Sequence, residues 1–403
     1  MAKVAVEIGL NVQPGQRLVI TGPVEAAPLV RQVAEAAYQA GAGSVLTLFD
    51  DDLLSRITMQ LAPEEGLRYF PKWLADGLAQ EAEDGCCFLS VVGSDPDLLA
   101  GVPPERTAIA MRAAEEATAA FRDHIMAGRV AWSIISLPTA AWARKVFPGR
   151  SEPEAVEALW QAIQRASRLE GPDPVGNWRS HVASLQLRAN WLNGLGIDRL
   201  HYRAVGTDLT VGLPPSHLWV AAGQKNAAGT EYVANIPTEE VFTLPERGRV
   251  DGTVRSTKPL AYAGQVIEGI RLTFEGGRIV SFGADRAEDN LRELIETDEG
   301  SHYLGEVSLV PVDSPIAKAD VLFYNTLFDE NASCHLAIGR AYPFTLTDGE
   351  EVTSDEVFLA KGGNVSLTHV DFMVGAADLA IDALTRSGAS VPIFREGRWA
   401  TAI

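Results

Sequence analysis

Alternation of short apolar runs with helical patterns is the feature that most constrains how this chain can fold. Near the N-terminus, R-L-V-I at Arg17–Ile20 is typical of a short buried strand between turns, and S-V-L-T-L-F at Ser44–Phe49 is typical of a second strand. Between them, Glu25–Ala40 carries apolar residues at helical spacing, and Gly41 follows as a helix stop. A strand, a helix and a strand within about 30 residues predict a βαβ unit with parallel strands.

The same alternation continues through the first half of the chain. A buried strand is expected at Gly85–Val92 and another strand at Val130–Leu137. Helices are expected at Glu64–Gln80, broken at Pro71, and at Pro104–Ile125, Pro153–Leu169 and Asn177–Leu192. The turn after the first strand reads T-G-P-V-E rather than G-x-G-x-x-G, so no dinucleotide site is predicted. We therefore expect an α/β domain with a parallel sheet over residues 1–180.

The second half of the sequence is richer in strands. Asp198–Ala204 and Asp208–Gly212 alternate apolar and polar residues, as strands do. Gly269–Phe282 forms two alternating runs around E-G-G, which predicts a hairpin, and Ala287–Glu299 has a helical pattern. A second hairpin is expected at F-R-E-G-R-W-A near the C-terminus. We expect residues 181–403 to form a mixed α+β domain that carries the catalytic site.

Size and charge narrow the possible functions. A chain of 403 residues suits two domains rather than one core. The net charge of −19 argues against nucleic-acid binding and suits cationic ligands, although solubility alone would also explain it. No run of about 18 apolar residues and no signal peptide is seen, so no membrane association is expected. The three cysteines fit no disulfide framework, which favours the cytoplasm.

Acidic residues and histidines recur inside apolar segments of the second half. The four clusters are V-A-N-I-P-T-E-E-V-F at Val233–Phe242, L-G-E-V at Leu304–Val307, D-E-N-A-S-C-H at Asp329–His335 and T-H-V-D-F at Thr368–Phe372. A carboxylate buried without a partner costs roughly several kcal/mol. No lysine lies within a cluster, whereas two histidines do. We interpret the set as a divalent-metal site, with two ions.

Two of the clusters combine an acid with an imidazole. His369 and Asp371 are two apart, so on a strand both side chains point to one face. Glu330 and His335 are five apart, and we expect Glu330 to precede a helix that holds His335 in its first turns. The alternatives are the wet face of an ordinary strand for the first pair and a capped helix for the second.

The other two clusters offer acids alone. Glu306 lies at the mouth of a predicted strand, and it is either a ligand or an exposed residue at a strand end. Of the adjacent Glu239 and Glu240, Glu240 abuts apolar residues and is the expected ligand. Each cluster alone is weak, but four carboxylates and two imidazoles together match a site for two divalent ions.

At these clusters the sequence resembles the thermophilic metalloaminopeptidase family, which includes aminopeptidases T, S and II of bacteria. The matching motifs are N-I-P-T-E-E-V-F-T, L-G-E-V-S-L-V-P, L-F-D-E-N-A-S-C-H-L-A-I-G-x-A-Y and T-H-V-D-F-M-V-G. The L-x-V-x-P-G-Q start and the F-R-E-G-R-W end are also similar, so the resemblance covers nearly the whole chain. It implies a homodimeric exopeptidase that removes N-terminal residues with broad tolerance and uses two ions of zinc or cobalt, with magnesium or manganese as alternatives.

The resemblance also implies roles for particular residues. By position, the metal ligands are Glu240, Glu306, Glu330, His335, His369 and Asp371, with Glu306 bridging the ions. The expected chemistry is attack by a hydroxide bridging the two ions, with Glu306 and Tyr342 catalytic. Tyr342 is expected to donate a hydrogen bond to the oxyanion, and a core or interface role is its alternative. Glu306 or Glu239 is the expected proton shuttle. Cys334 departs from the small polar residue expected beside His335.

Two other functions fit the same residues. One is another dinuclear metallohydrolase, such as an amidase or a carboxypeptidase. The other is an inactive protein that binds metal without catalysis.

Overall fold

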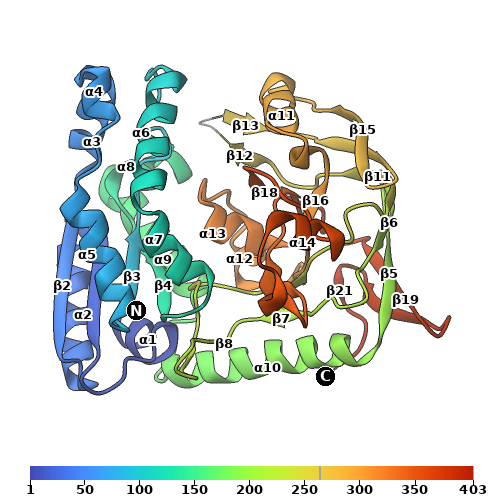
Figure 1. The fold of residues 1–403 in the computed structure, drawn as a ribbon, viewed down its shortest axis with the longest axis horizontal. Coiled ribbons are helices and arrows are strands. Elements are labelled where there is room, and N and C mark those ends of the chain that lie inside the picture. The colour runs from blue at the N-terminus through green and yellow to red at the C-terminus, as the bar shows by residue number, and fades with distance from the viewer. Residues whose placement is uncertain (263–264, 403) are drawn as a thin grey trace. The chain divides into compact units, whose positions relative to one another are not determined.

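The computed structural model of the chain describes residues 1–262 and 265–402 (Figure 1). The chain separates into two compact units. The first comprises Met1–Ser180 and Ala222–Pro237, and the second comprises His181–Ala221 and Thr238–Ile403. That each folds as an independent domain stays a prediction. Within the described part of the chain, no helix combines the length and the apolar character needed to cross a membrane.

The first unit is built on a parallel four-stranded sheet, as predicted. Its strands are β1 (Arg17–Pro23), β2 (Ser44–Asp50), β3 (Cys87–Val92) and β4 (Trp132–Ser136), in the order β2-β1-β3-β4. A short antiparallel pair, β8 (Gln224–Lys225) and β9 (Glu231–Tyr232), also belongs to this unit. Because β2 and β3 lie on opposite sides of β1, right-handed crossovers place the connecting helices on opposite faces of the sheet.

Helices cover this sheet. They are α1 (Ala2–Val4), α2 (Ala27–Gln39), α3 (Asp52–Leu61), α4 (Glu64–Leu67), α5 (Lys72–Glu83), α6 (Pro104–Ala117), α7 (Ala119–Met126), α8 (Ala140–Val146) and α9 (Glu152–Ala166). The break at Pro71 is confirmed, since α4 ends before it and α5 begins after it. The prediction of one continuous helix at Pro104–Ile125 is wrong, because Thr118 separates two helices, α6 and α7. The sequence patterns did not predict α3 or α8.

The second unit contains two antiparallel sheets. The smaller consists of β7 (Val220–Ala221), β10 (Val241–Thr243), β16 (Leu304–Leu309), β17 (His335–Gly339) and β18 (His369–Met373), in the order β18-β17-β16-β10-β7. Strands β16 and β17 are buried along their whole length. This sheet carries most of the acidic and histidine residues singled out in the sequence.

The larger sheet of the second unit has eight strands. They are β5 (Ile197–Ala204), β6 (Thr207–Gly212), β11 (Val250–Arg255), β14 (Arg271–Glu275), β15 (Arg278–Gly283), β19 (Ala380–Thr385), β20 (Ser390–Arg395) and β21 (Arg398–Trp399), in the order β15-β14-β11-β6-β5-β19-β20-β21. Both predicted hairpins are present, as β14–β15 and β20–β21. The predicted mixed α+β class is therefore confirmed for this half.

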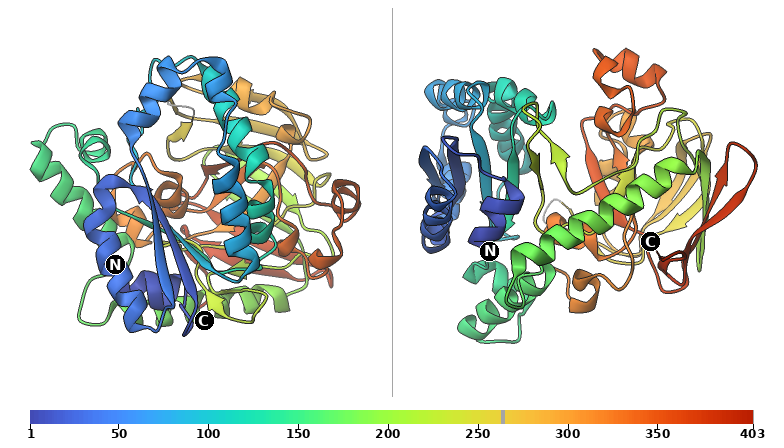
Figure 2. Two further views of the ribbon diagram at one scale, coloured as in Figure 1. Left: turned by 60° about the vertical axis from the view of Figure 1, so that its left-hand side comes forward. Right: turned by 90° about the horizontal axis from the view of Figure 1, so that it is seen from below.

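Shorter elements complete the second unit. They are the strand pair β12 (Leu260–Tyr262) and β13 (Gln265–Ile267) and the helices α11 (Glu288–Ile295), α12 (Pro315–Ala319), α13 (Thr326–Asp329) and α14 (Asp355–Ala360). The helix α10 (Pro174–Gly194) runs unbroken (Figure 2), and the division between the two units falls within it.

Candidate metal centre

Three adjacent strands of the smaller sheet bring distant acids and histidines onto one face. In an antiparallel sheet, directly opposed residues share a face. Glu306 on β16 is opposite Ala337 on β17, and Ala337 is opposite Asp371 on β18. His369 is opposite Gly339 at the next position of the same face. The central strand therefore presents only small residues between the functional side chains, which leaves room above it.

A second row of the sheet adds His335 and Glu240. His335 is opposite Ser308, which lies two residues after Glu306 and so shares its face. Glu240 immediately precedes β10, and its Oε2 accepts a hydrogen bond of 3.1 Å from the Ser308 hydroxyl. Ser308 thus fixes the Glu240 carboxylate beside the imidazole that faces it.

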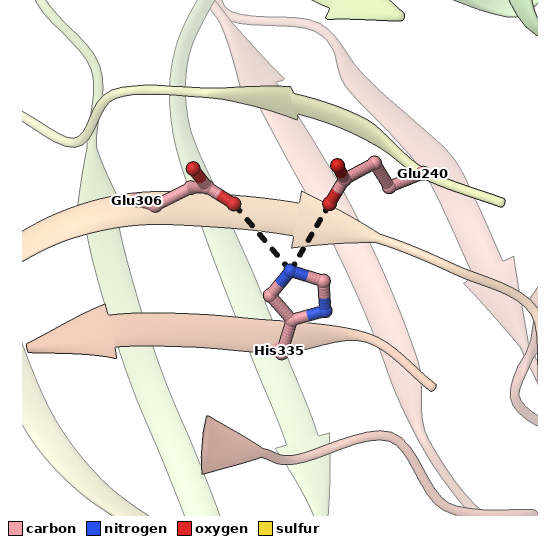
Figure 3. Close-up of side chains that lie close together, drawn as sticks. All are labelled: Glu240, Glu306 and His335. Carbon is pink, nitrogen blue, oxygen red and sulfur yellow. Dashed lines mark ion pairs between the residues drawn. The ribbon is translucent and has the colours of Figure 1, made fainter. Parts of the chain in front are cut away.

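The distances between these side chains describe two groups that meet at one carboxylate. The Nε2 atom of His335 lies 3.2 Å from Glu240 Oε2 and 3.4 Å from Glu306 Oε1 (Figure 3). The Nε2 atom of His369 lies 3.7 Å from Glu306 Oε2 and 3.5 Å from Asp371 Oδ1. In each group the donor atoms all lie within 4.8 Å of one another, as the ligands of one ion must. The two oxygens of Glu306 therefore face different groups.

Among the described residues, neither group of donor atoms includes Glu330, which lies outside the sheet. It begins the 3₁₀ helix η4 (Glu330–Ala332), and its Oε1 accepts a hydrogen bond of 3.3 Å from the Asn331 amide. Asn331 is fully buried, and its Oδ1 accepts a 2.8 Å hydrogen bond from the backbone N–H of Glu239. One amide therefore ties the Glu330 segment to the segment that carries Glu240.

The helix expected to hold His335 is wrong. Helix α13 ends at Asp329, Glu330 lies in η4, and His335 is the first residue of strand β17. Hydrogen bonding to β16 on one side and β18 on the other fixes this segment as a strand. Helix α13 is capped by Asn325, whose side chain accepts a hydrogen bond from the backbone N–H of Leu327.

Main-chain carbonyls orient both histidines. The Nδ1 atom of His335 lies 3.2 Å from the Ser333 carbonyl, and that of His369 lies 2.6 Å from the Arg340 carbonyl. Because a carbonyl only accepts hydrogen bonds, Nδ1 carries the proton in each ring. In the neutral form, each Nε2 then offers a lone pair toward carboxylates, which is the arrangement of a histidine that ligates metal.

Two polar atoms of the cluster lack hydrogen bonds. Among the described residues, His335 Nε2 and Asp371 Oδ1 are buried and make none. Buried polar atoms are normally satisfied, because an unsatisfied one costs about 1–3 kcal/mol. The two atoms belong to different groups of donor atoms, so a cation in each group would satisfy both. The donor set of carboxylate oxygens and imidazole nitrogens also fits a divalent ion.

Burial and mutual repulsion perturb the titration of the cluster. Burial, reinforced by the neighbouring Asp371 and Glu240 carboxylates, raises the pKa of Glu306 to about 7. The same causes raise the pKa of Glu330 well above its usual range. Burial alone would lower the pKa of His369, but the Asp371 and Glu306 carboxylates outweigh it and raise that pKa to about 10. Without a cation, the cluster therefore retains protons, which reduce the repulsion between its buried carboxylates.

Tyr342 lies beside the cluster, whereas Cys334 does not. The Tyr342 ring tilts against the His369 ring, with 4.8 Å between centroids. Burial, with the nearby carboxylates of Glu306 and Asp371, raises the pKa of Tyr342, so its hydroxyl stays protonated. Cys334 is adjacent to His335 on an extended segment, and its thiol donates to the Val310 carbonyl at 3.3 Å. The thiol thus packs away from the imidazole.

Sequence patterns missed the residues that support the cluster. Ser308, Asn331 and Ala337 hold or make room for ligands, yet none is charged or aromatic. Of the three, only Ser308 could have been found locally, since it shares a strand face with Glu306. Glu239 was considered for proton transfer, and its buried carboxylate lies 3.8 Å from His181 Nε2.

The chain is similar to known proteins in both sequence and fold. Residues 1–399 match the family model described as thermophilic metalloprotease (M29). Aminopeptidase AmpS of Bacillus subtilis is 48% identical over 99% of this chain and 97% of its own length. Aminopeptidase T of Thermus aquaticus is 44% identical over 99% of this chain and 97% of its own. The structure of wild-type AmpT from Thermus thermophilus superposes with a TM-score of 0.93 at 42% identity, covering 99% of this chain and 98% of that one.

Proposed function

The chain belongs to the thermophilic metalloprotease (M29) family, and from this premise we propose that it is a metal-dependent aminopeptidase. In this proposal it releases N-terminal amino acids from peptides and tolerates many side chains. The observation that carries the proposal is the convergence of two histidines and three carboxylates of the smaller sheet, with Glu306 shared between two groups. Aminopeptidase names among its full-length relatives support the choice of reaction.

Six residues would hold two divalent ions. They are Glu240, Glu306, Glu330, His335, His369 and Asp371, with Glu306 bridging. Four ionised carboxylates carry four negative charges, which two divalent cations neutralise. Zinc or cobalt suits this mixed oxygen and nitrogen set, and magnesium or manganese suits it less well because both favour oxygen ligands. When bound, such a pair supplies a hydroxide at neutral pH and polarises the peptide carbonyl.

The chain's own groups position and protonate the substrate. Tyr342, kept protonated by burial, donates a hydrogen bond to the oxygen that becomes negative during attack. Both oxygens of Glu306 would be committed to the ions that it bridges, which leaves Glu239, whose carboxylate lies 3.8 Å from His181 Nε2, as the candidate to pass a proton to the leaving amine. The carboxylates of the cluster would also accept hydrogen bonds from the free α-amine of a peptide, which would restrict cleavage to the first peptide bond.

Metal removal and restoration test this proposal. Treatment with a chelator should abolish hydrolysis of Leu-p-nitroanilide, and zinc or cobalt should restore it, because no side chain of the cluster supplies the nucleophile alone. Acetylation of the substrate amine should prevent cleavage. Equal cleavage of free and acetylated substrates would instead indicate an amidase or an endopeptidase. Metal binding without any hydrolysis would indicate an inactive protein.

Metal affinity should increase with pH. In the ion-free protein, the raised pKa values of Glu306, about 7, and His369, about 10, keep protons on both groups at neutral pH. An ion must displace those protons, so lowering the pH weakens binding and raising it strengthens binding. We expect affinity to rise from about pH 6 to about pH 8, by about tenfold per pH unit for each proton released. Calorimetry in buffers of different ionisation enthalpy measures the protons released, and an affinity independent of pH would contradict the prediction.

We also propose that the enzyme is a homodimer, formed through an apolar surface of the first unit. Helix α3 buries none of its residues, and its side chains Leu53, Leu54, Ile57 and Leu61 are 70%, 62%, 51% and 77% exposed. Strand β2 leads directly into α3, lies at the edge of the sheet and exposes Leu46 and Phe49. Such a surface favours pairing with a second copy, whose identical edge and helix are self-complementary.

A charged residue introduced on helix α3 should dissociate the proposed dimer into monomers. Leu54→Glu should convert the dimer into a monomer. A symmetric interface would then bury the new carboxylate of each copy without a partner, which costs free energy twice. Light scattering after gel filtration measures the mass. Leu187→Glu is the matched control, since Leu187 is 54% exposed on α10 in the second unit. A dimer that survives Leu54→Glu would place the contact elsewhere.

A further inference from the structure

Phe242 shares the face of the smaller sheet that carries the metal-ligand candidates. It is opposite Ser308 on β16, and Ser308 is opposite His335 on β17. Directly opposed residues of an antiparallel sheet point to the same side, so the Phe242 ring stands beside the charged cluster. A large apolar ring at this position serves neither to bind an ion nor to move a proton.

Two further rings extend from Phe242 to the other side of the cluster. Phe344 meets Phe242 edge to face, with 6.2 Å between centroids, and stacks on Tyr342 at 5.3 Å with the ring planes 14° apart. The Tyr342 ring in turn contacts the His369 ring at 4.8 Å. We call Phe242, Phe344 and Tyr342 the aromatic wall. Its two ends lie next to ligand candidates from opposite edges of the site.

The aromatic wall is only partly covered by the rest of the chain. The Phe344 residue is 38% exposed, and Phe242 and Tyr342 both keep part of their surface accessible. The neighbouring carboxylates and imidazoles, by contrast, are mostly buried, with His335 and Asp371 side chains 1% and 7% exposed. Apolar surface left open beside a charged, buried centre is the usual composition of a ligand site, in which polar groups orient the ligand and apolar walls bind the rest of it.

We propose that the aromatic wall is the subsite for the side chain of the substrate's first residue and that it favours large apolar and aromatic side chains. The inference rests on the proposed aminopeptidase function and specifies its substrate class. In a peptide, the α-amine, the first carbonyl and the first side chain all branch from one Cα. With the amine and the carbonyl at the charged cluster, the side chain must extend to a neighbouring surface, and the wall is the apolar surface that adjoins it.

Substitution of Phe344 tests the wall with little risk to folding, because this residue is already partly exposed. Phe344→Ala should lower kcat/KM about tenfold for Leu- and Phe-p-nitroanilide, since lost apolar contact in a specificity pocket changes rates by about 10–200-fold. Hydrolysis of Ala-p-nitroanilide should change less than about twofold. Phe344→Glu should raise the ratio of Lys- to Leu-p-nitroanilide hydrolysis, because a lysine ammonium would then meet a carboxylate.

Controls separate failure of this inference from failure of the proposed function. Leu359→Ala removes a 42% exposed apolar side chain of the same unit and should leave every ratio unchanged. If Phe344→Ala slows all substrates equally, or none, the wall does not hold the substrate side chain. If the zinc- or cobalt-loaded wild-type protein cleaves no substrate, the proposed function is wrong. Calorimetric binding of phenylalanine against alanine to the zinc-loaded protein then tests the wall alone, and equal affinities would overturn it.

Discussion

Glu306→Gln is expected to abolish turnover while leaving the fold intact. The two oxygens of Glu306 face His335 and His369 separately, so this carboxylate is the group shared by both halves of the site. An amide supplies a single acceptor oxygen and no negative charge, so it cannot bridge two cations in the same way. If the substitution removes several kcal/mol of transition-state stabilisation, kcat/KM decreases on the order of 10³-fold or more.

Bound metal and folding should be measured beside the rate. Glu306→Gln should reduce the bound metal from two ions per chain, measured by elemental analysis, while circular dichroism stays native. Glu275→Gln is the matched control, because Glu275 is an exposed acid at the end of β14 in the same unit. Near-normal hydrolysis by Glu306→Gln would remove this residue from the mechanism.

Ala337→Leu should weaken metal binding strongly, although the residue itself is not a candidate ligand. Ala337 lies between Glu306 and Asp371 on the central strand, and its small side chain leaves the space into which both carboxylates extend. A leucine side chain would occupy that space and push the ligands apart. Since displacement of a functional group by about 1 Å can cost about 100-fold, we expect metal affinity and kcat/KM both to fall by at least that factor.

A control variant must distinguish the effect of overpacking the core from the loss of the metal site. Adding methylenes to a packed core costs about 1–3 kcal/mol wherever it is done. Ala383→Leu, at a fully buried alanine of β19, should therefore lower the melting temperature to a similar extent. It should nonetheless retain two ions per chain. Equal loss of metal in both variants would mean that general destabilisation, and not loss of the space above Ala337, is responsible.

Local sequence patterns were sufficient for the fold class and for much of the first unit. The apolar runs Arg17–Ile20 and Ser44–Phe49 both form strands as predicted, and the helix between them is followed by a glycine in the left-handed region, Gly41, with φ of 98°. Helix α3 was not predicted. Its apolar residues Leu53, Leu54, Ile57 and Leu61 recur at helical spacing, but this short stripe was overlooked, and in the structure its side chains are exposed.

The segment around His335 shows where local patterns fail. The run A-S-C-H-L-A-I-G is short and rich in small residues, so its pattern does not distinguish a strand from a helix. Pairing with β16 and β18 makes it a strand, and that pairing joins residues far apart in the sequence.

Convergence of the site likewise depends on register. The spacing of His369 and Asp371 could be read from the sequence, because two residues on one strand decide it. The alignment of Glu306 with Ala337 and Asp371 could not, because it depends on an irregularity in β16 between Leu304 and Glu306. A shift of one residue would turn Glu306 to the opposite face.

The main-chain contacts of His335 and His369 bear on which metal the enzyme uses. Since the Ser333 and Arg340 carbonyls orient the rings, both imidazoles would already be in position if they bind an ion. A rigid scaffold of this kind accepts first-row cations of similar radius without rearranging, and their intrinsic affinities follow the Irving–Williams series. We therefore expect the resident ion to be chosen by the metal supplied, so that preparations from zinc-rich and cobalt-rich media carry different metals in one unchanged polypeptide.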